Sequence, residues 1–171
     1  KEQLGTGHGV VCDLPHIPDS FRHVLILCGD VPLIQAQTLK MLVRTHLAEK
    51  SDITVLAVEL ANPPGYGRIV VDADGGLQAI VEESDASVAQ KRIRLINTGI
   101  FCVQKEFLAE AVPQIKSDNA QGEIYLTDII EIAYAGQKPM GVVIGNDPVE
   151  ITGINTIEEL KSVAFAIKNR S

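Results

Sequence analysis

A strand, a helix and a second strand follow one another early in the chain, and this order limits the possible folds. The run VLILC at 24–28 is apolar throughout and stops at Gly29-Asp30, which predicts a central strand buried on both faces. Residues 36–49 repeat apolar side chains at helical spacing, so we expect an amphipathic helix there. The β-branched, apolar run at 52–60 predicts another buried strand. The β-α-β order therefore predicts an α/β fold with a parallel core.

The second half of the sequence changes character. A Pro-Pro-Gly breaker precedes two short runs joined by a Gly-Gly turn, which predict a β-hairpin over 68–83. The run at 95–103 predicts a strand whose glycine at Gly99 marks a bulge or a close approach of another group. Further elements are expected as helices at 105–114, 126–135 and 156–168 and a strand near 140–145. We therefore expect a mixed, mostly parallel sheet flanked by helices, with a hairpin insertion.

Composition narrows the function classes. The chain has 171 residues, which suits one domain, and its formal charge of −7 does not suit a polyanionic backbone, so we expect no nucleic-acid partner. No apolar run approaches the roughly 20 residues of a membrane span, so we expect no membrane insertion. Cys12, Cys28 and Cys102 are odd in number and widely spaced, which is typical of free thiols in a reducing compartment such as the cytoplasm.

Asp30 is a candidate for chemistry because it follows a predicted strand directly. Ligands of open α/β sheets bind beyond the carboxyl ends of the strands, and a carboxylate there could hold Mg²⁺, which usually bridges to substrate phosphates. The same residue could instead make a turn before Pro32 and cap the helix region that follows. On spacing alone, the turn is the better explanation.

Other candidates also have structural alternatives. Residues 3–9 contain three glycines whose backbone could approach a base or a phosphate, although a flexible terminus explains the pattern nearly as well. Glu82 and Glu83 end a strand and could accept sugar hydroxyls or form a solvated charged edge. Asn97, an amide in an apolar strand, must either find partners or face a cleft. Gly67 could serve an ordinary turn or a loop that faces a ligand.

Two polar segments can be explained as helix starts. Tyr125 and Thr127 lie close to the start of a predicted helix, where Thr127 and Asp128 could cap the helix or contact a ligand. Asn155, or Thr156 in a capping box, opens the last helix, and here the structural explanation is strong by itself.

Seven short segments, taken in order, resemble one family. They read QLGTGH, GDVPLI, GYGRIV, IVE, INTGI, NAQGEIYLTDII and GIN. This series resembles the uridyltransferase domain of bacterial N-acetylglucosamine-1-phosphate uridyltransferase, a sugar nucleotidyltransferase with a Rossmann-like nucleotide-binding fold. The resemblance runs almost from end to end, and NAQGExYLTD is far more specific than any glycine pattern. Together, the segments outweigh the structural alternatives.

The resemblance implies a reaction and a set of site residues. The family transfers UMP from UTP to N-acetylglucosamine 1-phosphate, giving UDP-N-acetylglucosamine and pyrophosphate, and it requires Mg²⁺. By this resemblance, Asp30 and Asn155 would be the metal ligands, and Gly5 and Thr6 would face the uracil. The remaining implied substrate contacts are Gly29, Gly67, Glu82, Asn97, Tyr125 and Thr127, with Glu82 and Asn97 on the sugar.

The sequence also departs from the family. The family begins with a phosphate loop, LAAGxGTRM, which this chain lacks, and Cys28 stands where the family commonly has Tyr. We therefore expect residues 1–171 to be a partial, inactive nucleotidyltransferase domain without the first strand and without the β-helix acetyltransferase domain that often follows. The alternatives are a non-catalytic sugar-nucleotide-binding module, or a nucleotidyltransferase for another sugar or base.

Overall fold

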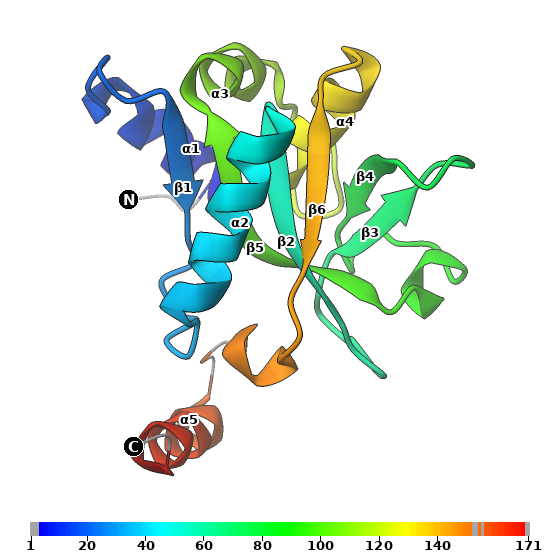
Figure 1. The fold of residues 1–171 in the computed structure, drawn as a ribbon. Coiled ribbons are helices and arrows are strands. Elements are labelled where there is room, and N and C mark those ends of the chain that lie inside the picture. The colour runs from blue at the N-terminus through cyan, green and yellow to red at the C-terminus, as the bar shows by residue number, and fades with distance from the viewer. Residues whose placement is uncertain (1–3, 152–153, 155, 170–171) are drawn as a thin grey trace.

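The computed structural model describes residues 4–151, 154 and 156–169, and its helices lie on both faces of one six-stranded sheet (Figure 1). The α-helices are α1 Thr6–Asp13, α2 Ala36–Glu49, α3 Lys105–Ala111, α4 Ile129–Ala135 and α5 Ile157–Asn169. The strands are β1 His23–Ile26, β2 Ile53–Glu59, β3 Arg68–Val71, β4 Leu77–Val81, β5 Leu95–Gln104 and β6 Met140–Ile144. The predicted α/β class, the hairpin and the predicted helices are confirmed.

Strand β5 organises the sheet. One of its edges pairs with β2, and β2 pairs in turn with β6, which gives the order β4-β3-β5-β2-β6. The other edge is shared, because β1 pairs with residues 101–104 and β3 pairs with Ile96. Between these two pairings, the described strands leave residues 98–100 uncovered on that edge. The opening lies where β1 ends and β3 begins.

The neighbours in the sheet differ from the prediction of a mostly parallel sheet. Strands β1, β2, β3 and β6 run in the same direction, as the β-α-β pattern predicts. However, β5 runs back between β2 on one side and β1 and β3 on the other, so that β2 and β6 form the one parallel pairing among the five described. The prediction of parallel strands holds for the common direction of β1, β2, β3 and β6. It is wrong for the hydrogen-bonded pairs, most of which are antiparallel.

The prediction that β1 is a central, doubly buried strand is also wrong. Among the described strands, β1 pairs with β5 alone, and Leu25 within it is 36% exposed. Leu27, which follows the strand, is 47% exposed. The apolar run was therefore a correct sign of a strand but not of its place in the sheet.

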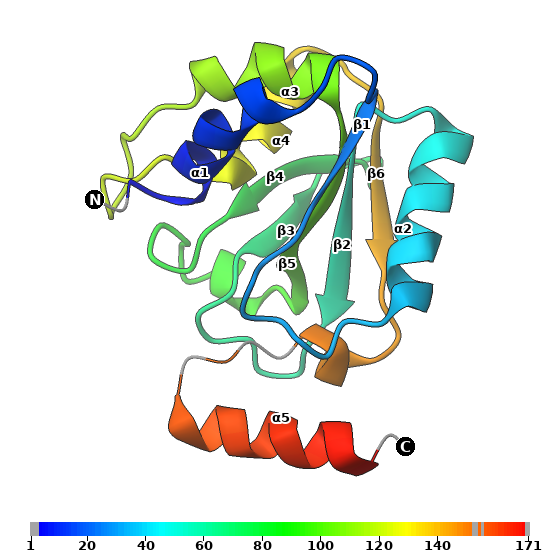
Figure 2. The same cartoon turned by 90° about the vertical axis from the view of Figure 1, so that its left-hand side faces the viewer.

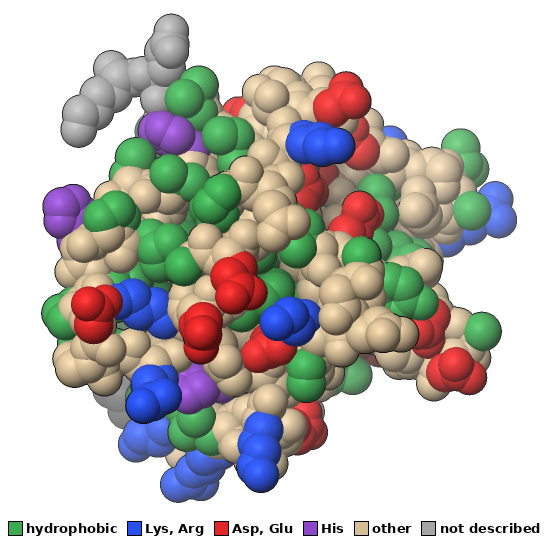
Figure 3. Space-filling model, turned by 90° about the horizontal axis from the view of Figure 1, so that it is seen from above, with side chains coloured by type: hydrophobic (Ala, Val, Ile, Leu, Met, Phe, Trp, Pro, Cys, Tyr) green, Lys and Arg blue, Asp and Glu red, His purple; other side chains and the backbone are tan. Residues whose placement is uncertain are grey.

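The core lies on both faces of the sheet, as Figure 2 shows with α2 on one side and α1, α3 and α4 on the other. Alternate residues of β2 point to opposite faces, so Val55 packs in the cluster that includes α3 and α4, while Leu56 packs with Leu42 of α2. Helix α5 lies apart from these layers (Figure 2). Figure 3 shows acidic and basic side chains together on the face of the molecule that is seen from above.

Candidate functional site

A hollow lies at the uncovered stretch of β5. Its volume of about 650 Å³ is typical of small-molecule sites. Six of the ten site residues predicted from the sequence line it, although they come from widely separated parts of the chain. These are Thr6, Asp30, Gly67, Glu82, Asn97 and Thr127. A second hollow, of about 580 Å³, lies between α2 and residues 146–150 and contains none of them.

The other four predicted residues are placed differently. Gly5, Gly29 and Tyr125 lie beside residues of the wall but do not line the hollow themselves. Tyr125 is 8% exposed, and its hydroxyl lies 3.4 Å from Ser84 Oγ. Asn155 lies outside the described residues.

Asp30 lies on the wall four residues beyond the end of β1, with its side chain exposed. Its carboxylate makes no hydrogen bond to another residue in the described part of the chain, and α2 begins instead beside the carboxylate of Glu150, which accepts the Gln35 N–H at 3.2 Å. Asp30 therefore does not cap α2. The Asp30 carbonyl accepts the N–H of Ile154 at 2.9 Å, which brings the segment before Asn155 to this wall.

The carboxylate of Glu82 bonds to Thr127 and lies close to Gly67. Thr127 Oγ1 donates to Glu82 Oε1 at 3.0 Å, and a Cβ on Gly67 would lie 3.2 Å from Glu82 Oε2. Burial raises the pKa of Glu82, with a smaller contribution from Asp85, and the Thr127 hydrogen bond opposes this shift. Glu82 is thus a partly desolvated carboxylate on the pocket wall, and the alternative of a solvated edge does not describe it. Thr127 bonds Glu82 and does not cap α4.

Asn97 lies at the predicted irregularity of β5. The register between β2 and β5 shifts opposite this region, and Gly99 has φ +75, so the predicted bulge is confirmed. A Cβ on Gly99 would overlap the Sγ atom of Cys28, which explains the need for glycine there. The Asn97 N–H donates to the Gly67 carbonyl at 2.9 Å, and its Oδ1 accepts the Gly99 N–H at 3.0 Å. Its Nδ2 has no partner among residues 4–151, 154 and 156–169, and is available to a ligand.

The glycine-rich start of the chain is a helix from residue 6, so the alternative of a flexible terminus does not describe residues 6–9. The N–H of Gly7 donates to the Ile124 carbonyl at 2.7 Å, and a Cβ on Gly7 would lie 2.7 Å from Ile124 Cγ2. Thr6 Oγ1 accepts the N–H of Leu126 at 3.0 Å. The glycines let α1 pack closely on the segment that leads to Thr127.

The family follows from comparison with known proteins. Residues 1–148 match the family model described as nucleotidyl transferase. The chain belongs to the nucleotidyl transferase family. It is 49% identical over 171 residues to the bifunctional protein GlmU of Geotalea uraniireducens (strain Rf4), a match that covers 99% of this chain and 37% of that protein. Two other proteins of that name are 39% identical over 170 residues, in Corynebacterium aurimucosum, and 41% identical over 160 residues, in Desulfotalea psychrophila.

The chain spans between about a third and a half of these relatives' length. The Corynebacterium match covers 99% of this chain and 35% of the relative, and the Desulfotalea match covers 94% and 47%. The resemblance inferred from the motifs is confirmed at the level of the nucleotidyl transferase family.

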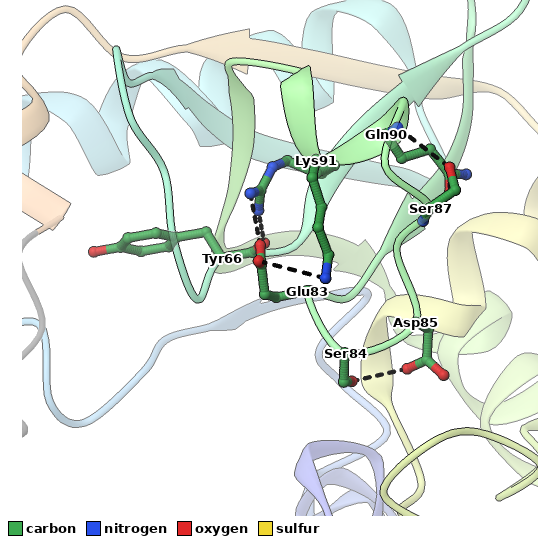
Figure 4. Close-up of polar contacts among 8 residues, drawn as sticks. Tyr66, Glu83, Ser84, Asp85, Ser87, Gln90 and Lys91 are labelled. Atoms are coloured by element: carbon green, nitrogen blue, oxygen red, sulfur yellow. Dashed lines mark hydrogen bonds and ion pairs between the residues drawn. The ribbon is translucent and has the colours of Figure 1, made fainter.

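Sequence reasoning missed two charged residues near this hollow. Arg68 begins β3 with its side chain 2% exposed, and its Nη2 lies 2.6 Å from Glu83 Oε2. The one available signal was a charged residue at the start of the apolar run RIVV. Asp85 was missed as well: it accepts the Ser84 hydroxyl at 3.0 Å (Figure 4) and the Ala120 N–H at 2.8 Å, which ties the two loops together.

The pocket offers few metal ligands of its own. Within the described part of the chain, no group of three His, Cys, Asp or Glu side chains is arranged to hold a metal ion. Mg²⁺ needs only one or two carboxylates when substrate phosphates and water supply its other ligands, and the exposed Asp30 carboxylate fits that role.

None of the helices described has both the length and the apolar character of a membrane span.

Proposed function

We propose that this chain carries the sugar-nucleotide site of an enzyme that transfers UMP from UTP to N-acetylglucosamine 1-phosphate, giving UDP-N-acetylglucosamine and pyrophosphate. The main support is that Asp30, Glu82, Asn97 and Thr127 line one hollow at the uncovered stretch of β5. Membership of the nucleotidyl transferase family supports the reaction class, and the similarity to GlmU proteins supports this substrate. We place the activity in the cytoplasm.

The proposed sugar contacts suit the chemistry of their side chains. Glu82 keeps one carboxylate oxygen on Thr127 and can accept a sugar hydroxyl with the other. The Nδ2 group of Asn97 can donate to the sugar or to its acetamido carbonyl. Gly67 leaves room for the ligand because a side chain there would crowd Glu82. Gly5 and Thr6 would lie on the uracil side.

Catalysis in this proposal consists of positioning and charge neutralisation. A sugar phosphate is already an anionic nucleophile, so no protein base is needed for its attack on the α-phosphate of UTP. Asp30 and Asn155 would hold Mg²⁺, which when bound offsets negative charge between the two phosphates. The backbone bond from Ile154 to Asp30 keeps the two segments that carry these ligands together.

Binding of the product tests the proposed sugar site. Titration calorimetry of the 171-residue chain with UDP-N-acetylglucosamine should show binding, and Glu82→Gln should weaken it by about ten- to a hundredfold, because a hydrogen bond to a charged group contributes about 1.5–3 kcal/mol. UDP-glucose should bind more weakly. Asp19→Asn, which alters an exposed ion pair on another part of the surface, is the matched control. Equal affinity for both sugar nucleotides would contradict the proposed sugar.

Turnover tests the reaction and the role of Asp30. The full-length product of the gene should release pyrophosphate from UTP and N-acetylglucosamine 1-phosphate. Asp30→Asn should lower this rate and raise the Mg²⁺ concentration needed for half-maximal rate, because an amide is a weaker ligand than a carboxylate. An unchanged Mg²⁺ dependence would remove Asp30 from the metal site.

A further inference from the structure

The loop before β3 forms part of the pocket wall. Pro64, Gly65, Tyr66 and Gly67 all line the hollow. Gly65 has φ +81, a left-handed conformation that glycine adopts without strain. The Gly67 carbonyl accepts the N–H of Asn97 at 2.9 Å, so the end of the loop is bonded to β5. The position of this loop therefore affects how Gly67 and Asn97 face a ligand.

Arg68 holds this loop from the first position of β3. Its side chain is 2% exposed, and its Nη1 donates to the Tyr66 carbonyl. Its Nη2 lies 2.6 Å from Glu83 Oε2. Lys91 Nζ lies 3.9 Å from the other oxygen of the same carboxylate (Figure 4). One guanidinium therefore joins the loop to the segment that follows β4.

The ion pair lies behind the pocket wall. Arg68 and Glu83 are not among the residues that line the hollow. Arg68 is opposite Val81 in the β3–β4 pairing, and opposite residues share a face of the hairpin. A Cβ on Gly67 would lie 3.2 Å from Glu82 Oε2, so Gly67 and Glu82 share the other face. Arg68 can therefore act on the pocket only through the backbone of the loop.

The bond from Arg68 to the loop depends on the negative charge of Glu83. Burial of a guanidinium is costly unless an anion accompanies it. Neither Arg68 Nε nor Glu83 Oε2 makes a hydrogen bond in the described part of the chain, so attraction between the charges holds the two side chains together. Without that anion, the guanidinium would move toward water and away from the Tyr66 carbonyl.

We propose that Arg68 is a positioning residue for the pocket. By holding the Tyr66 carbonyl, it fixes the loop of residues 64–67 beside Glu82 and Asn97, and Glu83 keeps Arg68 in place. The statement that this loop faces a sugar rests on the proposed function, whereas its fixation by Arg68 does not.

Removal of both charges tests the fixation of the loop. Arg68→Met/Glu83→Gln leaves no unpaired buried charge, so the variant should fold, but the Tyr66 carbonyl loses its donor. Amide hydrogen exchange, measured by ¹⁵N NMR without ligand, should be about tenfold faster at Asn97 and unchanged at the buried Leu42 of α2. An unaltered rate at Asn97, or the same acceleration at Leu42, would overturn the proposal.

Ligand binding tests the consequence for the proposed sugar site. The affinity of the double variant for UDP-N-acetylglucosamine should fall about tenfold, while its affinity for UDP, which has no sugar, should stay nearly the same. Equal losses for the two ligands would contradict a role of the loop in sugar binding.

Lys105→Met/Asp19→Asn is the matched control. It removes a 2.7 Å ion pair together with the 2.8 Å bond from Lys105 Nζ to the Ile17 carbonyl, in a part of the chain that does not line the hollow. This control should change neither the affinities nor the exchange rate at Asn97. A control as impaired as the Arg68→Met/Glu83→Gln variant would show that loss of any such ion pair has this effect, and would overturn the proposal.

Two outcomes need a separate measurement. If the double variant does not fold, Arg68→Lys keeps the charge beside Glu83 but replaces the planar fork that also reaches the Tyr66 carbonyl. Exchange at Asn97 should again be faster, and an unaltered rate would overturn the proposal. If the wild-type chain does not bind UDP-N-acetylglucosamine, the proposed function fails. The exchange measurement still decides the positioning role, because it requires no ligand.

Discussion

At the scale of single residues, burial and neighbouring acidic side chains raise the pKa of Asp128. Burial raises its pKa to about 6, and the neighbouring Glu131, Glu82 and Asp85 contribute in the same direction. In the unfolded chain, its usual value is 3.8. Between these two values the folded protein binds more protons than the unfolded chain, so the free energy of unfolding falls as the pH rises through this window.

Replacement of this carboxyl group should therefore stabilise the protein above pH 6. We expect Asp128→Asn to raise the free energy of unfolding by about 1–2 kcal/mol at pH 7.5, because one pKa unit corresponds to about 1.4 kcal/mol and solvent screens part of the effect. At pH 4 the difference should be small. Urea denaturation at both pH values measures it, and a variant less stable than the wild type at pH 7.5 would show that the charge of Asp128 does not destabilise the fold.

The site residues differ in how far the sequence could predict them. Glu82, Asn97 and Thr127 could be predicted because each interrupts or ends an apolar run and each falls in a motif of the resemblance. Arg68 could not, because its pairing with Glu83 depends on the register of the β3–β4 hairpin, which brings residues 15 positions apart together. Contacts between residues far apart in the sequence can be identified only once the strand register is known.

At the scale of elements, α2 begins at a carboxylate from a distant part of the chain. Glu150 is 8% exposed, and its Oε2 accepts the Gln35 N–H at 3.2 Å and the Thr38 hydroxyl at 2.6 Å. A negative charge at the start of a helix satisfies its free N–H groups and interacts favourably with the helix dipole. The contact attaches the turn Pro148–Ile151 to α2.

Loss of this contact should destabilise the protein. Glu150→Ala leaves the Gln35 N–H and the Thr38 hydroxyl without their partner, so we expect the free energy of unfolding to fall by about 1–3 kcal/mol. Thr38→Val, which removes one of the two bonds, should cost less. Urea denaturation of the two single variants and the double variant measures the coupling. Fully additive losses would show that Glu150 and Thr38 act independently.

Element positions followed from hydrophobic periodicity more reliably than element neighbours did. Helix α2 was predicted at its observed bounds because fourteen residues carry a clear apolar stripe. Helix α1 was missed because three glycines between residues 5 and 9 normally disfavour a helix, and here two of them are required by close packing on Ile124. The pairing of β1 was mistaken because an apolar run does not specify what covers it.

At the scale of the whole molecule, a buried histidine joins β1, α2 and β2. His46 of α2 is 0% exposed, with its Nε2 2.9 Å from His23 Nδ1 and its Nδ1 3.0 Å from Thr54 Oγ1. Burial lowers the pKa of His46 from its usual 6.5, and His23 lowers it further, while Asp52 opposes the shift. Below pH 6.5 the unfolded chain therefore takes up a proton that folded His46 resists, so stability is lost as the pH falls.

The histidine should be visible in the pH dependence of unfolding. We expect His46→Gln to be less stable than the wild type at pH 7.5 by about 1–2 kcal/mol, since it loses buried packing and hydrogen bonds. Between pH 6.5 and 5 it should lose less stability than the wild type. Urea denaturation across this range, with the exposed His16→Gln as control, tests this. A parallel pH dependence in His46→Gln and the wild type would contradict the role of His46.

The pairings of β5 also determine when the sheet can form during synthesis of the chain. Strands β1 and β2 precede β5 in the sequence, and each pairs with it; the other partner of β2, β6, is synthesised later still. His23 must wait for Gln104 to leave the ribosome, which at about 5–20 residues per second takes several seconds. During that interval the apolar strand ITVLAVE lacks both of the partners that it has among the described strands, β5 and β6. The pairings of β1 and β2 with β5 can therefore form in full only after residue 104 has emerged, and the pairing of β2 with β6 only later still.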